Sequence, residues 1–160
     1  MSKFKKLALA LIFLLALAGC QTKEQEPLRV YSFHGEDTLF SVSNGVIVQS
    51  EEQDIFCGGE LKTLEGFPEE IAEFTTTYYW VDGSEESVIT QNAVVDQTGE
   101  SIKADGDLGK MWGEKGSFLS LKEGWTDQLY FELEVIQKDG TTHTYRLKMD
   151  VTEVTPAGQQ

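Results

Sequence analysis

The C-terminal part of the chain alternates regularly between hydrophobic and polar positions, and this predicts two paired β-strands. Hydrophobic residues recur at every second position over Gln128–Gln137 and again over Thr142–Val151. Successive side chains of a strand point to opposite faces, so each segment has one apolar face. The linker 138–141 contains Asp-Gly, a favoured hairpin turn. On the polar faces we expect acidic and basic residues to meet across the hairpin: Glu132 and Glu134 on one strand, Arg146 and Lys148 on the other.

The same alternation predicts further strands towards the N-terminus. Residues 73–81 (EFTTTYYWV) are rich in threonine and aromatics, and Tyr78 and Trp80 share one face while Tyr79 takes the other. A second hairpin is predicted at 43–45, because Ser-Asn-Gly separates LFSV from VIVQ. Turn residues recur at 57–59, 98–99, 105–106 and 123–124. The other expected strands are Leu28–Phe33, Gly59–Leu64, Ser87–Val95 and Ser117–Leu121.

Many short strands with regular turns predict an all-β chain. Only Pro68–Phe74 suits a helical turn, with proline near its start and glutamates after it. We therefore expect an antiparallel β-sandwich, immunoglobulin-like, although the Cys-Trp-Cys spacing of antibody domains is absent. A small lipocalin-like β-barrel is the alternative, and the irregular stretch Gln97–Gly116 argues against its eight even strands.

The N-terminus has the pattern of an export signal. Lys3, Lys5 and Lys6 precede the apolar run Leu7–Ala18, which is shorter than the about 20 residues of a membrane-spanning helix. The run ends in Leu-Ala-Gly-Cys at 17–20, which resembles the lipobox of bacterial lipoproteins. That resemblance implies that Cys20 carries a diacylglyceryl group and that the lipoprotein signal peptidase cuts before it.

This resemblance divides the chain into four segments. We expect a signal peptide at 1–19, a lipidated cysteine and polar tether at 20–27, one β domain at 28–153 and a loose tail at 154–160. Two acyl chains suffice for stable anchoring. The expected location is extracytoplasmic, on the outer leaflet of the plasma membrane, or on the outer membrane in a host with two membranes.

The chain is strongly acidic, with a formal net charge of −14 that becomes −17 when the three signal lysines leave. Such a chain is repelled by nucleic acids and by anionic headgroups, so we expect no nucleic-acid partner. The membrane contact is then the lipid anchor itself, and we expect a monomer.

The thiol and imidazole groups do not suggest a catalytic site. If Cys20 is lipidated, Cys57 is the remaining thiol and no internal disulfide forms. The surroundings of Cys57 (QDIFCGGEL) match no nucleophile signature, and His34 and His143 have no ligand spacing for zinc or copper. We therefore expect that the protein is not an enzyme.

Two features suggest binding. Asp96, Asp105 and Asp107 fall in what should be one long loop and are weak calcium candidates, although the EF-hand pattern is not met. Trp112 lies in the glycine-rich stretch GKMWGEKG and is the best candidate for an exposed ligand-binding aromatic. Apart from the lipid group and this calcium candidate, we expect no cofactor.

The mature chain is similar in general character to small single-domain lipoproteins of Gram-positive bacteria, through segments such as FHGEDTLFSVSNGVIV. This likeness transfers no functional residue. The resulting hypothesis is a lipid-anchored, non-catalytic binding module at the cell envelope, with a protein or cell-wall partner. The alternative is a metal- or solute-binding accessory lipoprotein of a transport system.

Overall fold

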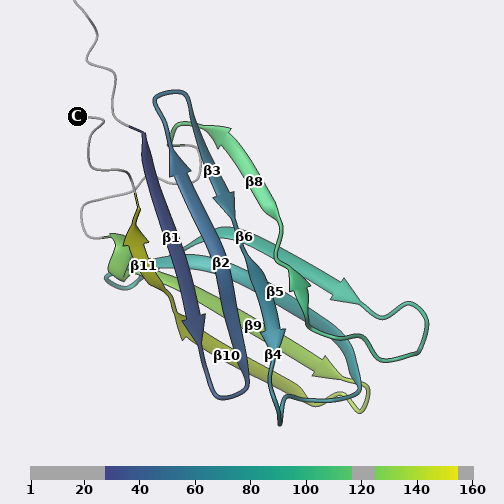
Figure 1. Cartoon of the computed structure of the whole chain (residues 1–160). Coiled ribbons are helices and arrows are strands. Elements are labelled where there is room, and N and C mark those ends of the chain that lie inside the picture. The colour runs from purple at the N-terminus through teal and green to yellow at the C-terminus, as the bar shows by residue number, and fades with distance from the viewer. Residues whose placement is uncertain (1–27, 117–124, 155–160) are drawn as a thin grey trace, which may run out of the picture.

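Short antiparallel strands make up most of the protein in the computed structural model, which describes residues 28–116 and 125–154 (Figure 1). The strands and the one 3₁₀ turn are β1 (Arg29–Glu36), β2 (Phe40–Gln49), β3 (Gln53–Cys57), β4 (Glu60–Thr63), β5 (Ile71–Asp82), β6 (Glu85–Val95), β7 (Gly106–Asp107), β8 (Lys110–Glu114), η1 (Trp125–Asp127), β9 (Leu129–Gln137), β10 (Thr142–Lys148) and β11 (Asp150–Glu153).

The strands form two sheets that face each other. Sheet A has the order β11-β1-β2-β3-β8, with β4 also paired to β2 and β7 paired to β4, and sheet B has the order β10-β9-β5-β6. In Figure 1 sheet A lies in front of sheet B. The prediction of an all-β antiparallel sandwich is confirmed, and among the described residues neither sheet closes into a barrel.

The strand order differs from that of an immunoglobulin domain. In immunoglobulin domains the third strand lies in the opposite sheet from the first two. Here β1, β2 and β3 are neighbours in sheet A, joined by successive hairpin connections. The predicted sandwich is therefore correct, but the predicted immunoglobulin-like strand order is wrong. The alternation of hydrophobic and polar residues shows which face of a strand a side chain is on, and does not show which strands are neighbours.

The chain crosses between the sheets at Met149. β10 belongs to sheet B and β11 to sheet A, and the buried Met149 between them donates its N–H to Leu129 O at 2.9 Å. This crossing fixes β10 and β11 on one side of the sandwich. The opposite side is formed by β6 of sheet B and by β7 and β8 of sheet A.

The predicted C-terminal hairpin forms, with part of the expected charge pairing. Arg146 lies opposite Glu132, and its Nε donates to a Glu132 carboxylate oxygen at 2.7 Å. Glu134 instead faces Thr144, and Lys148 faces Tyr130. The register set by the turn therefore gives one of the two expected ion pairs.

The predicted Asn44-Gly45 hairpin is wrong, because both residues lie inside β2. Asn44 adopts φ 59°, and the pairing of β1 with β2 shifts between Phe33 and Gly35, so the residues form a bulge. The Phe33 ring lies against Gly45, where a Cβ would overlap it. Asn-Gly suits positive φ in a bulge as well as in a turn, and the long-range contact with Phe33 selects the bulge.

Other local predictions also differ from the structure. Residues 68–74 form no helical turn, because Glu70 takes φ 53° and β5 begins at Ile71; the one helical turn among the described residues is η1. The stretch 97–116 is not one irregular loop, since it contains β7 and β8. Strand β3 was not predicted, and the expected strand 117–121 lies outside the described residues.

Aromatic side chains fill the space between the sheets. Tyr78 of sheet B packs on Phe56 of sheet A and Phe131 of sheet B, with ring centroids 5.0 and 4.9 Å apart. Its hydroxyl donates to Gly58 O at 2.6 Å, at the break between β3 and β4. Burial raises the pKa of Tyr78 far above its usual value of 10. The tyrosine therefore stays a neutral hydrogen-bond donor that satisfies a carbonyl at the break.

Candidate functional site

Trp112 lies on strand β8 and not in a loop, and its neighbours form an apolar row across sheet A. Trp112 is paired with Ile55, Ile55 with Val48, and Val48 with Val30. Val154 extends the row, because its N–H donates to Val30 O at 2.7 Å. Paired residues of neighbouring strands share a face, so these five side chains form one continuous line, named here the Trp112 row.

The Trp112 row lies on the outer face of sheet A. The adjacent inward positions Ile47 and Phe56 are buried, so the alternate positions Val48 and Ile55 point outward. Trp112 is 70% exposed, and the three residues in the middle of the row are half-buried. None of the row belongs to the hydrophobic core or packs against it. The outer face of sheet A therefore presents hydrophobic side chains to its surroundings.

Cys57 lies beside this row and has no histidine near it. It is half-buried and free, on the same outer face, paired with Val46 and Lys110. His34 is on β1, separated from β3 by β2, and His143 is on β10 of the other sheet, where Nε2 lies 3.0 Å from the Gln137 side-chain oxygen. The structure thus brings no imidazole to the thiol.

The other tryptophans are not exposed platforms. Trp125 is buried in η1, with its ring edge-on to Tyr31 at 4.8 Å, and Trp80 packs against the core. Among the aromatic residues considered from the sequence, Trp112 is therefore the one with a largely exposed ring on an apolar face.

The three aspartates considered for calcium accept hydrogen bonds from the protein itself, locally at Asp96 and Asp107 and over a long range at Asp105. Asp96 accepts from the Thr98 and Gly99 N–H groups at 2.8 and 3.1 Å, and these bonds lower its pKa. Asp105 accepts from Thr63 N–H and Oγ1 at 2.6 and 2.8 Å. Asp107 accepts from Gly109 N–H at 2.6 Å. Within the described ranges, no three carboxylate, thiol or imidazole groups are close enough to hold a metal ion together.

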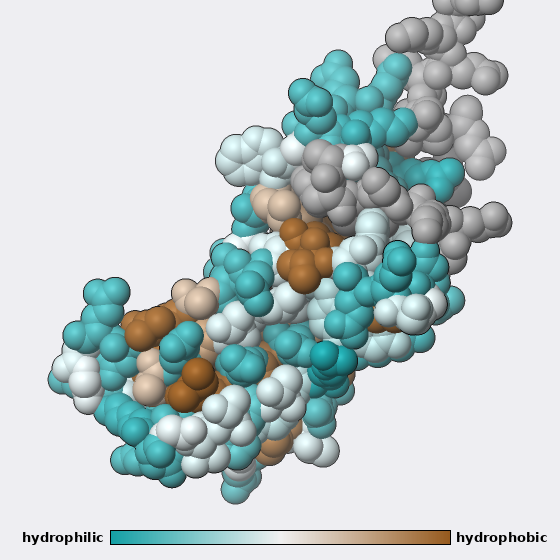
Figure 2. Space-filling model, turned by 180° about the vertical axis from the view of Figure 1, so that it is seen from behind, coloured by the Kyte–Doolittle hydropathy of each residue, from teal (hydrophilic) through white to brown (hydrophobic). Residues whose placement is uncertain are grey.

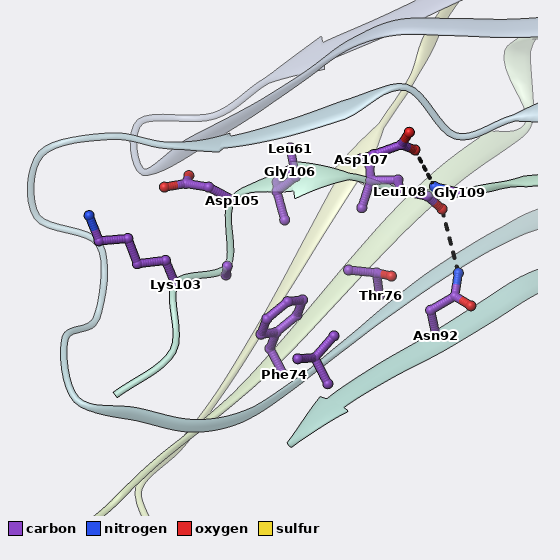
Figure 3. A pocket seen from close by; sticks show the side chains of 12 residues that line it. Leu61, Phe74, Thr76, Asn92, Lys103, Asp105, Gly106, Asp107, Leu108 and Gly109 are labelled. Carbon is purple, nitrogen blue, oxygen red and sulfur yellow. Dashed lines mark hydrogen bonds between the residues drawn. The ribbon is translucent and has the colours of Figure 1, made fainter. Parts of the chain in front are cut away.

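Asp105 and Asp107 line a cavity of about 390 Å³ at the side of the sandwich where β6 and β7 lie (Figure 3). Its apolar wall combines Leu61 of sheet A with Phe74 and Val94 of sheet B. Asp96 and Trp112 are not among its lining residues. The sequence did not suggest this cavity, because its walls come from segments that are distant along the chain.

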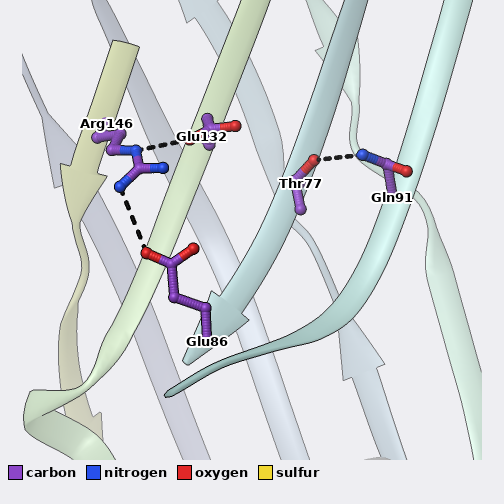
Figure 4. A network of polar contacts seen from close by, with 5 residues as sticks. All are labelled: Thr77, Glu86, Gln91, Glu132 and Arg146. Carbon is purple, nitrogen blue, oxygen red and sulfur yellow. Dashed lines mark hydrogen bonds and ion pairs between the residues drawn. The ribbon is translucent and has the colours of Figure 1, made fainter. Parts of the chain in front are cut away.

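The outer face of sheet B is different in character. Figure 2 shows this face covered mostly by hydrophilic side chains, with separate hydrophobic patches. Arg146 bridges Glu132 and Glu86, at 2.7 and 3.4 Å, and Gln91 donates to Thr77 at 3.2 Å on the neighbouring strand pair (Figure 4). This face satisfies its polar groups with one another.

One buried acid was not suggested by the sequence. Asp54 points into the sandwich from β3, and its side chain is 1% exposed. One carboxylate oxygen accepts the Gly116 N–H at 2.7 Å, whereas the other has no hydrogen-bond partner among the residues described. A lone acid in a short mixed segment gives no signal of burial, since the pairing of β3 with β2 and β8 decides its orientation.

Cys20, the predicted site of lipid attachment, lies outside the described residues. Over 28–116 and 125–154, no helix combines the length and the apolar character needed to cross a bilayer. No protein family model matches the chain, and neither a curated protein nor a solved structure is significantly similar to it.

Proposed function

We propose that the chain is a lipid-anchored, non-catalytic binding module of the cell envelope that contacts a protein partner through the Trp112 row. The observation that carries this proposal is the continuous hydrophobic line on the outer face of sheet A, ending in a tryptophan that is 70% exposed. Hydrophobic patches of this kind on a soluble domain mark interaction surfaces.

The composition of the row supports a protein partner. Tryptophan is enriched among the residues that dominate binding energy, and interface centres are apolar with a polar rim. Ser32, Thr152 and Lys110 occupy the neighbouring positions on the same face and supply such a rim. The row is smaller than the about 800 Å² that each partner buries in a standard interface, so it is the centre of the contact and not its whole extent.

The charge of the chain favours a protein over the lipid surface. The net charge of −14, which becomes −17 once the signal lysines leave, repels anionic headgroups. The expected anchor at Cys20 lies nine residues before Arg29, so an extended tether reaches about 30 Å. Because the row includes Val30, it lies within reach of the membrane-proximal domain of a neighbouring membrane protein.

The anchor is tested separately from the binding surface. Replacement of Cys20→Ser in the full chain should abolish labelling by a radioactive fatty acid and move the protein from the membrane fraction to the soluble fraction. Unchanged labelling in this variant would contradict lipidation at Cys20.

The binding surface is tested by site-specific crosslinking in intact cells. A photo-reactive phenylalanine analogue replaces Trp112 in one variant and Tyr130, on the outer face of sheet B, in the matched control. We expect one defined adduct from position 112 and none from position 130. Excess purified domain should compete for that adduct, whereas the domain carrying Trp112→Ala should not. Equal adducts from both positions, or none from either, would contradict the proposal.

A further inference from the structure

The sandwich is open on the side formed by β6. This strand is at the edge of sheet B and pairs with β5 alone among the described residues. Its pairing with β5 shifts between Tyr78 and Tyr79, where Ile89 is an extra residue of β6 and points inward. Bulges of this kind protect an edge from further pairing. The bulge protects the first half of β6 and leaves Thr90–Val95 regular.

The backbone of Thr90–Val95 presents unused hydrogen-bonding groups. Asp96 N–H donates to Ala72 O at 2.7 Å. In an antiparallel pair these bonds alternate along the strand, so the N–H and C=O groups of Val95, Ala93 and Gln91 point away from β5. No described residue pairs with that side. The stretch contains no proline, lysine or second bulge, which are the usual protections of an edge.

The inward side chains of the same stretch line the cavity shown in Figure 3. Asn92 and Val94 alternate with the outward Ala93 and Val95. The Asn92 amide donates to Leu108 O at 3.5 Å and closes one end of the cavity against sheet A. A cavity of about 150 Å³ holds benzene, so the 390 Å³ here accommodate a leucine or phenylalanine side chain.

The negative charge around the β6 edge favours a positively charged ligand. From 96 to 109 the chain carries four acids and a single lysine, Lys103. Glu85 and Glu86 lie at the other end of β6. Lys138 donates to Gly99 O at 2.6 Å and Arg146 lies 3.4 Å from Glu86, so the acids named here still outnumber the cations. A cationic segment complements this border, whereas the same edge of a second copy repeats its negative charge.

We propose that Thr90–Val95 binds an extended, cationic peptide segment of a partner protein as an added antiparallel strand. The backbone of the segment pairs with Gln91, Ala93 and Val95, and one apolar side chain enters the cavity beside Val94. Strand addition to a free edge gives affinity through the main chain and specificity through pockets for alternate side chains. This site is separate from the Trp112 row, so each can fail without the other.

The test uses the soluble chain and four fluorescent octapeptides, Lys-Thr-X-Thr-X-Thr-X-Lys, in which X is valine, leucine, isoleucine or phenylalanine. We expect at least one to bind, by fluorescence anisotropy, with a Kd below about 1 mM. N-methylation of a threonine beside its central X residue should remove binding, because that N–H points to β6, whereas N-methylation of the central X residue itself, whose N–H points away, should not. If none of the four binds at that concentration, the proposal is wrong.

Two matched pairs of variants separate the backbone from the cavity. Ala93→Pro removes one outward N–H, whereas Ala93→Thr keeps it, so the first should weaken binding about tenfold or more and the second less than about twofold. Val94→Asp places a charge in the cavity, whereas Val95→Asp places the same charge on the opposite face. We expect about a tenfold loss for Val94→Asp alone. Equal effects within both pairs would overturn the proposal, provided that thermal melts show all four variants folded.

Analytical ultracentrifugation distinguishes a peptide ligand from a second copy of the chain at the β6 edge. A second copy pairing edge to edge through β6 would give a dimer that Ala93→Pro dissociates, and this result would replace the peptide with a second copy. A monomer at concentrations that bind peptide is the expected result.

Discussion

The outer faces of the two sheets present their aromatic residues in opposite ways. Tyr79 points outward from sheet B, yet it is 4% exposed, because Tyr130 stacks on it at 5.8 Å and Arg146 lies over its ring at 5.7 Å. Trp112 points outward from sheet A and is 70% exposed, with Ile55 as its cross-strand partner. An outward aromatic is therefore not by itself a binding site.

The difference lies in what surrounds each ring. Arg146 of β10 lies over the Tyr79 ring, and its charge is paired with Glu132 of β9 and Glu86 of β6. On sheet A the cross-strand partners along the row are the β-branched Ile55, Val48 and Val30, and Trp112 remains 70% exposed beside Lys110 and Glu114. Sheet B covers its outward aromatic ring with its own side chains, although Val88 and Val95 on its edge strand β6 are 63% and 54% exposed, whereas sheet A leaves a continuous apolar line that ends in an uncovered ring.

The largest expected effect is on partner binding. Trp112→Ala should weaken binding of the crosslinked partner by about 30-fold, which is about 2 kcal/mol, because exposed tryptophans at interface centres are frequent hot spots. The matched control is Val88→Ala on β6, a hydrophobic residue that is 63% exposed but lies outside the row. Titration calorimetry with the purified partner should give a control affinity within about twofold of the wild type. Equal losses of affinity in Trp112→Ala and Val88→Ala would show that the outer face of sheet A is no more important for binding than that of sheet B.

Stability should depend on Tyr79 more than on Trp112, the reverse of the order expected for partner binding. Tyr79→Ala should lower the free energy of unfolding by about 2 kcal/mol, because it exposes the stacked face of Tyr130 and leaves a gap beneath Arg146. Urea unfolding followed by tryptophan fluorescence measures this change, and Tyr79→Phe is the control, since it keeps the ring and should retain most of the stability. A Tyr79→Ala variant as stable as the wild type would show that sheet B does not depend on its covered outer face.

A smaller effect is expected at Arg146. Arg146→Met keeps the length of the side chain but removes the contacts with Glu132 and Glu86 and the charge over Tyr79, so it should lower Tm by about 2 °C at low salt. Ion pairs at the surface are screened by salt. The difference in Tm from the wild type should therefore shrink at about 0.5 M NaCl, and a difference that grows would contradict the electrostatic origin.

The smallest effect is the stability of Trp112→Ala itself. Because Trp112 contributes nothing to the core, its removal should change the free energy of unfolding by less than about 0.5 kcal/mol. The same urea titration checks this expectation. A larger loss of stability would mean that the Trp112 ring is part of the fold. The binding surface would then have to be tested with a substitution of another residue of the row, such as Ile55.

Some of the fold could be predicted because its signals are local. The hairpin of β9 and β10 follows from period-two alternation on both sides of Asp-Gly, and the opposite orientation of Tyr78 and Tyr79 follows from adjacency alone. The bulge at Asn44 could not be distinguished from a turn, because both use the same backbone conformation and only the Phe33 ring distinguishes them.

The candidate sites depend on longer-range information. Trp112 could be identified as exposed from its polar, glycine-rich surroundings, but not as the end of a row. The sequence offered Asp105 as a calcium candidate, and it gave no sign of its hydrogen bonds to Thr63, which is 42 residues away. Asp54 had no local signal of burial at all, since its inward orientation depends on two strand pairings.

The sequence by itself determined which residues are hydrophobic, which faces they share along each strand, and hence that this chain is an antiparallel β-sandwich. It also contains the N-terminal pattern from which an export signal and lipid anchoring are predicted. Only the tertiary structure decided that Val30, Val48, Ile55, Trp112 and Val154 lie in one line, and that the edge of β6 borders a cavity. The physical reason is that alternation fixes the face of a residue within its own strand, whereas strand order and register between distant segments fix its neighbours.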